Sequence, residues 1–375
     1  EGDTEMDSKK TGGGSVILQS LKPLNATVLI GLSLNLEITL EGKLPEDAQE
    51  HVARYGKNLV KAVDHIPATP GTPAIFRVTT LDGNEFTIPC DGQSEMAAGS
   101  SVNVAFVLRA LGISDVGIIG AVGEGSGASS LIPALEPTIS SMLLYKSEGT
   151  SRTITVRDPS GGGSTLLCAK KPYHLGPKVL DQLAGATPNV LVLTGVKPMD
   201  MVAARSLYKS SAKVRAIMPH ASLLRDDAGC VVFKKELLPK TDLLQLNAEE
   251  AQLLLGDQTP FEPESIRRIS ELGPQMVIVT MGANGAVLME KDGEPEIVKA
   301  FPSDKVVDTS GIGDTHFATF INYRWLRQPQ LSLVHCLTMA GWIASRKVAQ
   351  IGPWAGIPSK EDREVMIANI LAKEK

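Results

Sequence analysis

Short apolar runs alternate along the chain with stretches of helical periodicity. Continuous apolar runs, without polar residues in alternation, are typical of strands buried on both faces of a parallel sheet. The pattern therefore predicts an α/β fold, with a mainly parallel central sheet flanked by helices on both sides. The runs are TVLIGLSL at 27–34, VGIIGAV at 116–122, NVLVLTG at 189–195, DLLQLN at 242–247 and MVIVTMG at 276–282.

Two regions interrupt this alternation and predict a lid. Residues 45–66 have a helical pattern, and the strand-like runs after them flank Asp82-Gly83, a strong hairpin signal. Residues 151–168 repeat the arrangement around a Pro-Ser-Gly-Gly-Gly turn. We expect the hairpins to form a small second sheet over the carboxyl ends of the parallel strands, where α/β folds bind ligands. The lid elements are expected within 38–92 and 144–172.

Composition and charge exclude several other classes of protein. The chain has 375 residues, of which 43% are hydrophobic and 4% aromatic, with a formal net charge of -5. That charge gives no broad basic field, so no nucleic-acid or membrane partner is expected. No stretch of about 18 apolar residues occurs. The four cysteines form no CxxC pair, which favours the cytoplasm or another reducing compartment.

The chain is expected to contain one functional domain. Residues 1–14 are polar and end in a glycine run, which is typical of a disordered tail or a remnant of processing. Residues 15–375 are predicted to form the domain.

The sequence DTSGIGDTHFATF at 308–320 carries the main candidate chemistry. VVDT is predicted to end a strand, SGIG to turn, and the following residues to form a helix. Free N–H groups at such a helix start, with the positive end of the helix dipole behind them, attract anions. The alternative is that the acid only stabilises the helix start and the glycines only permit the turn. The residues concerned are Gly311, Ile312, Gly313 and Asp314.

DTSGIGD resembles the DTxGAGD signature of the ribokinase-like (PfkB) family of carbohydrate and nucleoside kinases. The resemblance implies a ribokinase-like fold, ATP and Mg²⁺ as cofactors, Asp314 as the base and the amides of Gly311, Ile312 and Gly313 as an anion hole. Ile312 departs from the usual alanine. No GxxxxGK[ST] sequence occurs, which excludes a P-loop.

Two further segments resemble the family's nucleotide side. Asn247 and Glu250 match an NxxE element whose glutamate organises hydrated magnesium, although the same pair also fits a helix capping box. Thr280, Gly282 and Gly285 match a TxGxxG turn that lines the nucleotide.

The substrate side of the resemblance is weaker. Asn35 and Glu37 occupy the places of an asparagine and an aspartate that hold substrate hydroxyls, so the acid is one methylene longer than usual. Gly99 and Asn103 match a glycine-rich helix start. Arg152 resembles a lid arginine that meets a sugar phosphate, with a solvated strand residue as its alternative.

Other positions depart from the family or leave a choice open. Ala98 replaces a glycine and Gly125 replaces an aspartate. Asp308, together with the segment 344–358, resembles a site for a monovalent cation such as K⁺. His316 either packs on its helix or touches the nucleotide or substrate.

The preferred hypothesis is ATP-dependent phosphoryl transfer to a hydroxyl of a sugar or sugar-like small molecule. The alternatives are an adenosine-like nucleoside kinase and a non-catalytic member that binds nucleotide or sugar as a regulatory protein. A dehydrogenase reading of the glycine-rich loop at 120–127 ranks last, because its spacing is not GxGxxG. A homodimer through lid strands is one expectation, and lid edges covered by residues 45–66 are the other.

Overall fold

The structure is a computed structural model, and the statements below concern the residues that it describes. These are 17–20, 26–41, 46, 59–60, 62–66, 69, 75–80, 83–89, 94–123, 126–147, 152–157, 163–168, 173–303, 305–327, 331–352 and 354–372. The predicted tail at residues 1–14 and Gly125 lie outside them.

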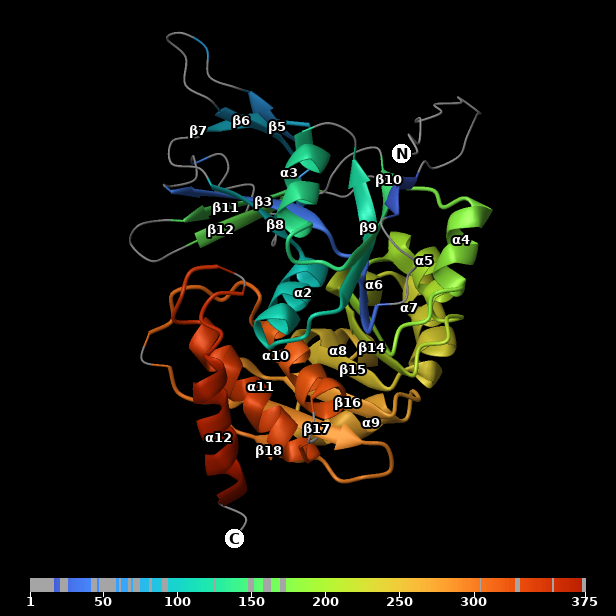
Figure 1. Ribbon diagram of the computed structural model, residues 1–375, viewed down its shortest axis with the longest axis vertical. Coiled ribbons are helices and arrows are strands. Elements are labelled where there is room, and N and C mark those ends of the chain that lie inside the picture. Colours follow the sequence, from blue (N-terminus) through green and yellow to red (C-terminus); the bar gives the residue numbers. More distant parts are fainter. Residues whose placement is uncertain are drawn as a thin grey trace, which may run out of the picture.

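A main sheet runs through the body of the molecule (Figure 1). In the spatial order given below, the first strand and the last two pair antiparallel at the two edges of the sheet, and the strands between them pair in parallel. All five predicted apolar runs form strands of this sheet, which confirms the α/β prediction. In spatial order the strands are β1 (Ile17–Ser20), β10 (Ser141–Ser147), β9 (Val116–Gly123), β2 (Val28–Gly31), β13 (Val190–Val196), β14 (Val214–Pro219), β15 (Leu243–Asn247), β16 (Met276–Thr280), β17 (Ala286–Glu290) and β18 (Glu296–Val298).

Helices cover both faces of the main sheet. One group, coloured teal and orange to red in Figure 1, contributes to the core on one face, and the green to gold group contributes to the other. The first group is α2 (Ser100–Ala110), α3 (Ser126–Leu135), α10 (Ile312–Ile321), α11 (Leu333–Lys347) and α12 (Lys360–Ala372). The second is α4 (Pro177–Ala184), α5 (Met201–Leu207), α6 (Ala221–Leu224), α7 (Asp227–Val232), α8 (Ala248–Leu255) and α9 (Ile266–Ser270).

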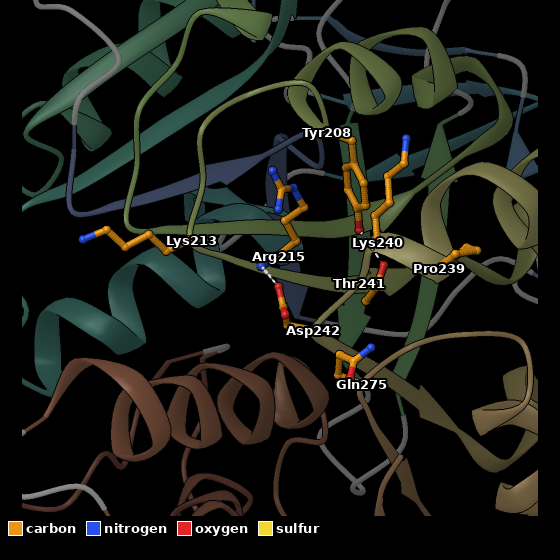
Figure 2. A pocket seen from close by; sticks show the side chains of 8 residues that line it. All are labelled: Tyr208, Lys213, Arg215, Pro239, Lys240, Thr241, Asp242 and Gln275. Atoms are coloured by element: carbon orange, nitrogen blue, oxygen red, sulfur yellow. Dashed lines mark hydrogen bonds between the residues drawn. The ribbon is translucent and has the colours of Figure 1, made fainter. Parts of the chain in front are cut away.

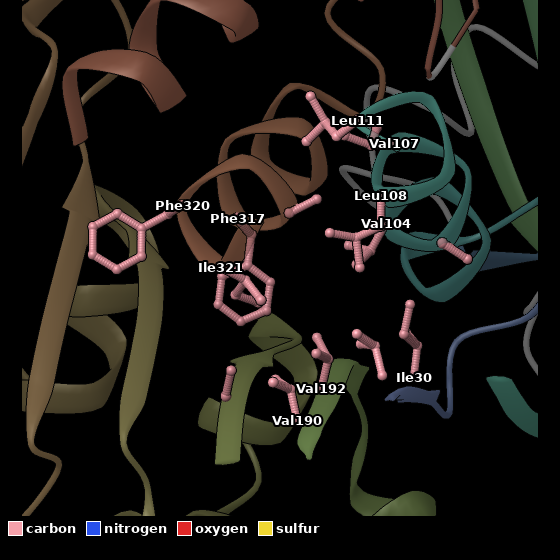
Figure 3. Packing of buried hydrophobic residues seen from close by; sticks show 14 of the residues in the cluster. Ile30, Val104, Val107, Leu108, Leu111, Val190, Val192, Phe317, Phe320 and Ile321 are labelled. Carbon is pink, nitrogen blue, oxygen red and sulfur yellow. The ribbon is translucent and has the colours of Figure 1, made fainter. Parts of the chain in front are cut away.

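Successive residues of one strand enter opposite cores. Val190 and Val192 of β13 pack with α2 and α10 on one face, whereas Leu191 and Leu193 pack on the other (Figure 3). Side chains alternate along a strand, so an uninterrupted apolar run fills both layers. Phe317 and its neighbours on α10 are fully buried against this sheet, which anchors the helix whose first turn carries Asp314.

Two smaller sheets lie beyond the carboxyl ends of the parallel strands, where β3 follows β2 along the chain (Figure 1). Both predicted hairpins are present and a small sheet beside the main sheet is confirmed. The expectation that the two hairpins share one sheet is wrong, because β6–β7 and β11–β12 belong to different sheets. The lid sheet contains β4 (Leu59–Val60), β12 (Gly163–Cys168), β11 (Arg152–Arg157), β3 (Asn35–Glu41) and β8 (Ser94–Ala98). The outer sheet contains β5 (Ala62–Ile66), β6 (Ile75–Thr79) and β7 (Glu85–Pro89).

Two predicted elements differ from the structure. The helix expected over 45–66 is wrong at residues 59–60 and 62–66, which are strands paired with β12 and β6. Short apolar runs do not distinguish a strand from a helix, and pairing decides between them. Residues 306–309 do not end a strand, because the N–H groups of Val307 and Asp308 donate to the carbonyl of Val348 at the end of α11.

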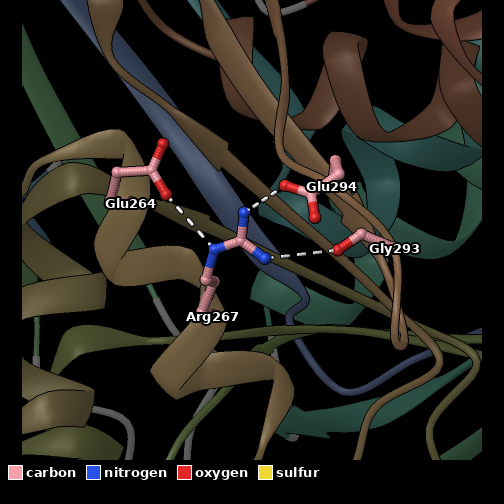
Figure 4. A network of polar contacts seen from close by, with 4 residues as sticks. All are labelled: Glu264, Arg267, Gly293 and Glu294. Atoms are coloured by element: carbon pink, nitrogen blue, oxygen red, sulfur yellow. Dashed lines mark hydrogen bonds and ion pairs between the residues drawn. The ribbon is translucent and has the colours of Figure 1, made fainter.

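The far edge of the main sheet is tied to α9 by polar contacts. Arg267 of α9 donates to Glu264 in the turn before that helix, and to Gly293 and Glu294 in the turn between β17 and β18 (Figure 4). These groups are exposed, so they fix the turn more than they stabilise the fold. Among the described helices, none combines the length and hydropathy needed to cross a bilayer.

Candidate active site at the start of helix α10

A left-handed glycine turn delivers the chain into α10. Gly311 precedes the helix with φ of 72°, a conformation that favours glycine. The N–H groups of a first helical turn have no intrahelical acceptor and point away from the helix axis. Of the three amides predicted to form an anion hole, that of Ile312 already makes a weak bond of 3.4 Å to the carbonyl of Thr309.

Asp314 lies in this first turn with only 7% of its surface exposed. The side-chain amide of Asn103, one turn into α2, donates to its carboxylate at 2.7 Å. Burial raises the pKa of Asp314 above its ordinary value, although hydrogen bonds from Asn103 and Ser100 and the charge of Lys347 oppose the rise. Asp314 therefore interacts with two side chains of α2 as well as lying in the first turn of its own helix.

The other end of the Asn103 amide is unsatisfied. Its Oδ1 is buried and has no hydrogen-bond partner among the described residues. A buried acceptor without a donor is costly, by about 1–3 kcal/mol. Asn103 donates to Asp314 through its Nδ2 group, and its Oδ1 atom could therefore accept a hydrogen bond from a hydroxyl bound near the carboxylate.

A buried glutamine fixes the peptide that leads into Asp314. The Nε2 group of Gln245, on β15, donates to the carbonyl of Gly313 at 2.9 Å, and its Oε1 lies 2.9 Å from Nδ1 of His316. Because Oε1 can only accept, Nδ1 of His316 carries the proton. Burial lowers the pKa of His316 to about 4, so the ring is neutral at pH 7. His316 is thus buried between α10 and β15, where it pairs with Gln245.

Asp308 joins the turn before α10 to the loop after α11. Its two carboxylate oxygens accept from the N–H groups of Ser310 and Gly352, each at 2.8 Å. Nζ of Lys347 donates to its carbonyl oxygen at 2.8 Å. Burial raises the pKa of Asp308, but the N–H groups of Gly352 and Ser310 and the ammonium of Lys347 outweigh it, so the pKa lies below its ordinary value.

The predicted nucleotide residues lie together at the carboxyl edge of the main sheet. Asn247 ends β15 and pairs in register with Thr280, which ends β16. Asn247 and Glu250 form a complete capping box, with bonds of 2.8 and 2.9 Å. Gly282 begins the turn that follows, with φ of 58°. Gly285 cannot be replaced, because a Cβ there would lie 2.0 Å from the carbonyl of Val298.

Strand pairing brings the predicted substrate positions toward α2. Asn35 on β3 pairs with Ala98 on β8, directly before Gly99, which precedes α2 with φ of 96°. Glu37 lies two residues further along the same strand, and Arg152 pairs with Leu36 from β11. The side chains of Asn35, Glu37 and Arg152 lie outside the described part of the chain.

A surface hollow of about 510 Å³ lies at the amino ends of the parallel strands (Figure 2). Lys213, Asp242 and Gln275 each precede a parallel strand and line it. The backbone N–H of Arg215 donates to Asp242 at 2.8 Å, a contact that holds the amino ends of β14 and β15 together. The hollow is thus separated from Asp314 by the length of the strands.

Sequence reasoning missed Gln245 and Lys347 as residues of this region. Both are polar side chains within apolar surroundings, and they are 1% and 0% exposed. A lone polar residue inside a predicted strand or at the end of an apolar helix was the available signal. Polar groups in such positions need buried partners.

A family model described as pfkB family carbohydrate kinase matches residues 75–360. The ATP-dependent 6-phosphofructokinase of Thermoanaerobacterium thermosaccharolyticum is 24% identical over 263 residues, which cover 67% of this chain and 79% of that protein. The 1-phosphofructokinase of Escherichia coli K12 is 26% identical over 286 residues, 73% of this chain and 86% of that protein.

Solved structures share the fold. Ribokinase of Arabidopsis thaliana, in complex with ribose and ATP, matches with a TM-score of 0.63 and 17% identity over 92% of this chain and 99% of its own. Adenosine kinase of Sinorhizobium meliloti matches with a TM-score of 0.64 and 18% identity over 91% of this chain and 99% of its own. The ribokinase-like fold predicted from the sequence is therefore confirmed.

The pair of Gln245 and His316 should be energetically coupled. Either Gln245→Leu or His316→Phe leaves a buried polar group without its partner, which costs about 1–3 kcal/mol of unfolding free energy. The double variant removes both groups, so it should be less destabilised than the sum of the single variants, by about 0.5–3 kcal/mol. Urea unfolding of the four proteins measures this difference, and strict additivity would contradict the pairing.

Asp314→Asn should stabilise the folded protein at neutral pH. Because the pKa of folded Asp314 is raised, its contribution to stability is complete below the unfolded value of about 3.9 and is lost as the pH rises through the folded value. The variant should therefore unfold at a higher temperature than the wild type at pH 7.5, and this advantage should shrink on acidification. Exposed Asp181 provides the control, Asp181→Asn. A constant difference across pH would refute the raised pKa.

Proposed function

The chain belongs to the pfkB family of carbohydrate kinases and is thus a small-molecule kinase, and from this premise we propose how its site works. The proposed reaction transfers the γ-phosphoryl group of ATP to a hydroxyl of a sugar or sugar-like molecule. The observation that carries the proposal is the buried Asp314 held by Asn103 at the start of α10. Residues 15–375 are proposed to act as one kinase domain, with lid elements within 38–92 and 144–172.

Asp314 is proposed to orient the attacking hydroxyl and accept its proton. A loose phosphoryl-transfer transition state needs little help from a base, so positioning matters more than basicity. Burial raises the pKa of Asp314, so its carboxylate is a better proton acceptor than that of an exposed aspartate. The hydroxyl donates to Asp314, and Oδ1 of Asn103 accepts from a neighbouring hydroxyl of the same molecule, which satisfies the buried oxygen.

The anion hole is proposed to consist of the amides of Gly311, Ile312 and Gly313. Negative charge on the transferring group interacts with these N–H groups and with the positive end of α10. Gln245 supports this geometry, because it holds the carbonyl of Gly313 and hence the peptide plane before Asp314. The amide of Ile312 exchanges its long bond to Thr309 for the phosphoryl oxygen.

ATP is proposed to lie along the carboxyl ends of β15 and β16. Asn247 and Thr280 end these strands, and Gly282 and Gly285 lie in the turn that follows β16. In the described part of the chain, no group of three His, Cys, Asp or Glu side chains could hold a metal alone. Mg²⁺ usually binds one or two carboxylates together with substrate phosphates and water, and Glu250 fits that use. Bound Mg²⁺ supplies charge neutralisation on the phosphates.

The acceptor is proposed to meet Asn35, Glu37, Gly99, Asn103 and Arg152. The pairing of β3 with β8 leads Asn35 and Glu37 toward α2 and Asn103, which supports a shared pocket for these residues. Arg152 pairs with Leu36, between the two, so its part in the pocket rests on the family resemblance. An adenosine-like nucleoside is the second candidate, because adenosine kinase is among the proteins that share this fold. A homodimer is proposed through β8, an edge strand of the lid sheet.

The direct test is ADP release from Mg·ATP with a panel of free sugars, phosphosugars and nucleosides. Asp314→Asn should lower kcat by about 10²–10⁴, with little change in KM for ATP, because a group used in the transition state is lost. Asp181→Asn, on the exposed face of α4, should behave as the wild type. Acceptor-dependent turnover that survives in Asp314→Asn would remove the proposed base. ATP binding without turnover for any acceptor would favour the regulatory alternative.

Glu250→Gln separates the metal role of this residue from its capping role. The amide oxygen of glutamine can still accept from the N–H of Asn247, so the capping box and the unfolding temperature should be retained. The lost charge should raise the Mg²⁺ concentration needed for half-maximal turnover. The neighbouring Glu249→Gln, on the exposed surface, is the matched control. An unchanged Mg²⁺ requirement would reduce Glu250 to a helix cap.

A further inference from the structure

Lys347, the last residue of α11, is fully buried. An ammonium group removed from water is costly unless it is paired with acceptors and opposite charge. Solvent-exposed lysines are the rule, so a lysine in this position requires a reason. None of the proposed steps of phosphoryl transfer uses it.

Lys347 makes two contacts with Asp308. Nζ donates to the carbonyl oxygen of Asp308 at 2.8 Å and lies 3.7 Å from its Oδ2. Asp308 in turn accepts from Ser310, the residue before the glycine turn, and from Gly352 in the loop after α11. That loop lies directly on the lysine, because a Cβ at Gly356 would lie 3.2 Å from the Cα of Lys347. The ammonium group therefore lies at the junction that shapes the turn before α10.

The monovalent cation expected at Asp308 does not fit beside this ammonium group. An ion bound there would use the carbonyl or carboxylate oxygens of Asp308, which Lys347 already contacts. Two positive charges on the same oxygens, in a place removed from water, repel each other strongly. An added cation would thus have to displace the lysine.

We propose that the ammonium group of Lys347 is a built-in cation that takes the place of a bound monovalent ion, so that the protein works without K⁺. This inference rests on the proposed kinase function. Lys347 is a positioning residue, because it touches Asp308 and not the reacting atoms. Its charge holds the carbonyl and carboxylate of Asp308, and through Ser310 it fixes the turn that presents the amides at the start of α10.

The effect of Lys347 extends to Asp314. Its positive charge lowers the pKa of that carboxyl group and so opposes the effect of burial. A fixed ammonium group supplies this charge at every salt concentration, whereas a bound ion supplies it only when its site is filled. The positive charge beside Asp308 is therefore present whichever monovalent cation the medium contains.

The test compares K⁺ with choline at constant ionic strength. The wild type should show the same kcat and KM in both salts. Lys347→Ala should lower kcat by roughly 100-fold, as expected for a displaced site, and K⁺, ammonium or ethylammonium should restore part of it. Lys347→Met keeps the apolar stem and fills the space, so it should lose activity without rescue. Arg346→Ala removes the neighbouring exposed cation and should leave the salt response unchanged.

Thermal unfolding gives a second result that does not depend on turnover. An ion that binds only the folded protein raises its unfolding temperature, so Lys347→Ala should be stabilised by K⁺ relative to choline, and the wild type should not. Wild-type turnover that requires K⁺, or wild-type stabilisation specific to K⁺, would overturn the inference. Absence of turnover with every acceptor in both salts would instead refute the kinase function, while the unfolding data would still decide whether Lys347 replaces the ion.

Discussion

The charge balance around the start of α10 is the constraint on which the rest of the site depends. Asp314 is buried, which raises its pKa, and hydrogen bonds from α2 and the charge of Lys347 at the end of α11 oppose that rise. Three helices therefore have to meet at one point with their side chains correctly paired. The shared hydrophobic core of α2, α10 and α11 keeps them there.

The same junction explains why polar residues interrupt apolar elements. Gln245 in β15, His316 in α10 and Lys347 in α11 are all buried, and each contacts the backbone or side chains around the glycine turn. Apolar residues at these positions would pack as well but would leave the turn free to adopt other arrangements. Burying these polar groups costs free energy, but their hydrogen bonds fix the geometry of the helix start. Electrostatic catalysis requires such a fixed geometry.

Local patterns were sufficient to predict the sheet and the turn before α10. The five apolar runs between residues 27 and 282 contribute to the cores on both faces of the sheet, so their uninterrupted apolar pattern was enough to identify them as strands. The strand β4 was missed because its identity depends on pairing with β12, which is distant in sequence. The strand β5 pairs with the next strand, β6, but its short run does not by itself distinguish a strand from the end of a helix. Lys347 and Gln245 were missed for a related reason: their partners lie 39 and 68 residues away along the chain.

In the proposed reaction, the phosphoryl group passes from ATP to a hydroxyl of a sugar-like acceptor at Asp314. Phosphorus NMR of the protein with Mg·ATP and an acceptor follows the γ-phosphate directly. The account predicts a new phosphate-ester signal that grows in equal amount with ADP, with no matching rise of inorganic phosphate. Loss of the γ-phosphate only to inorganic phosphate, whatever the acceptor, would contradict it.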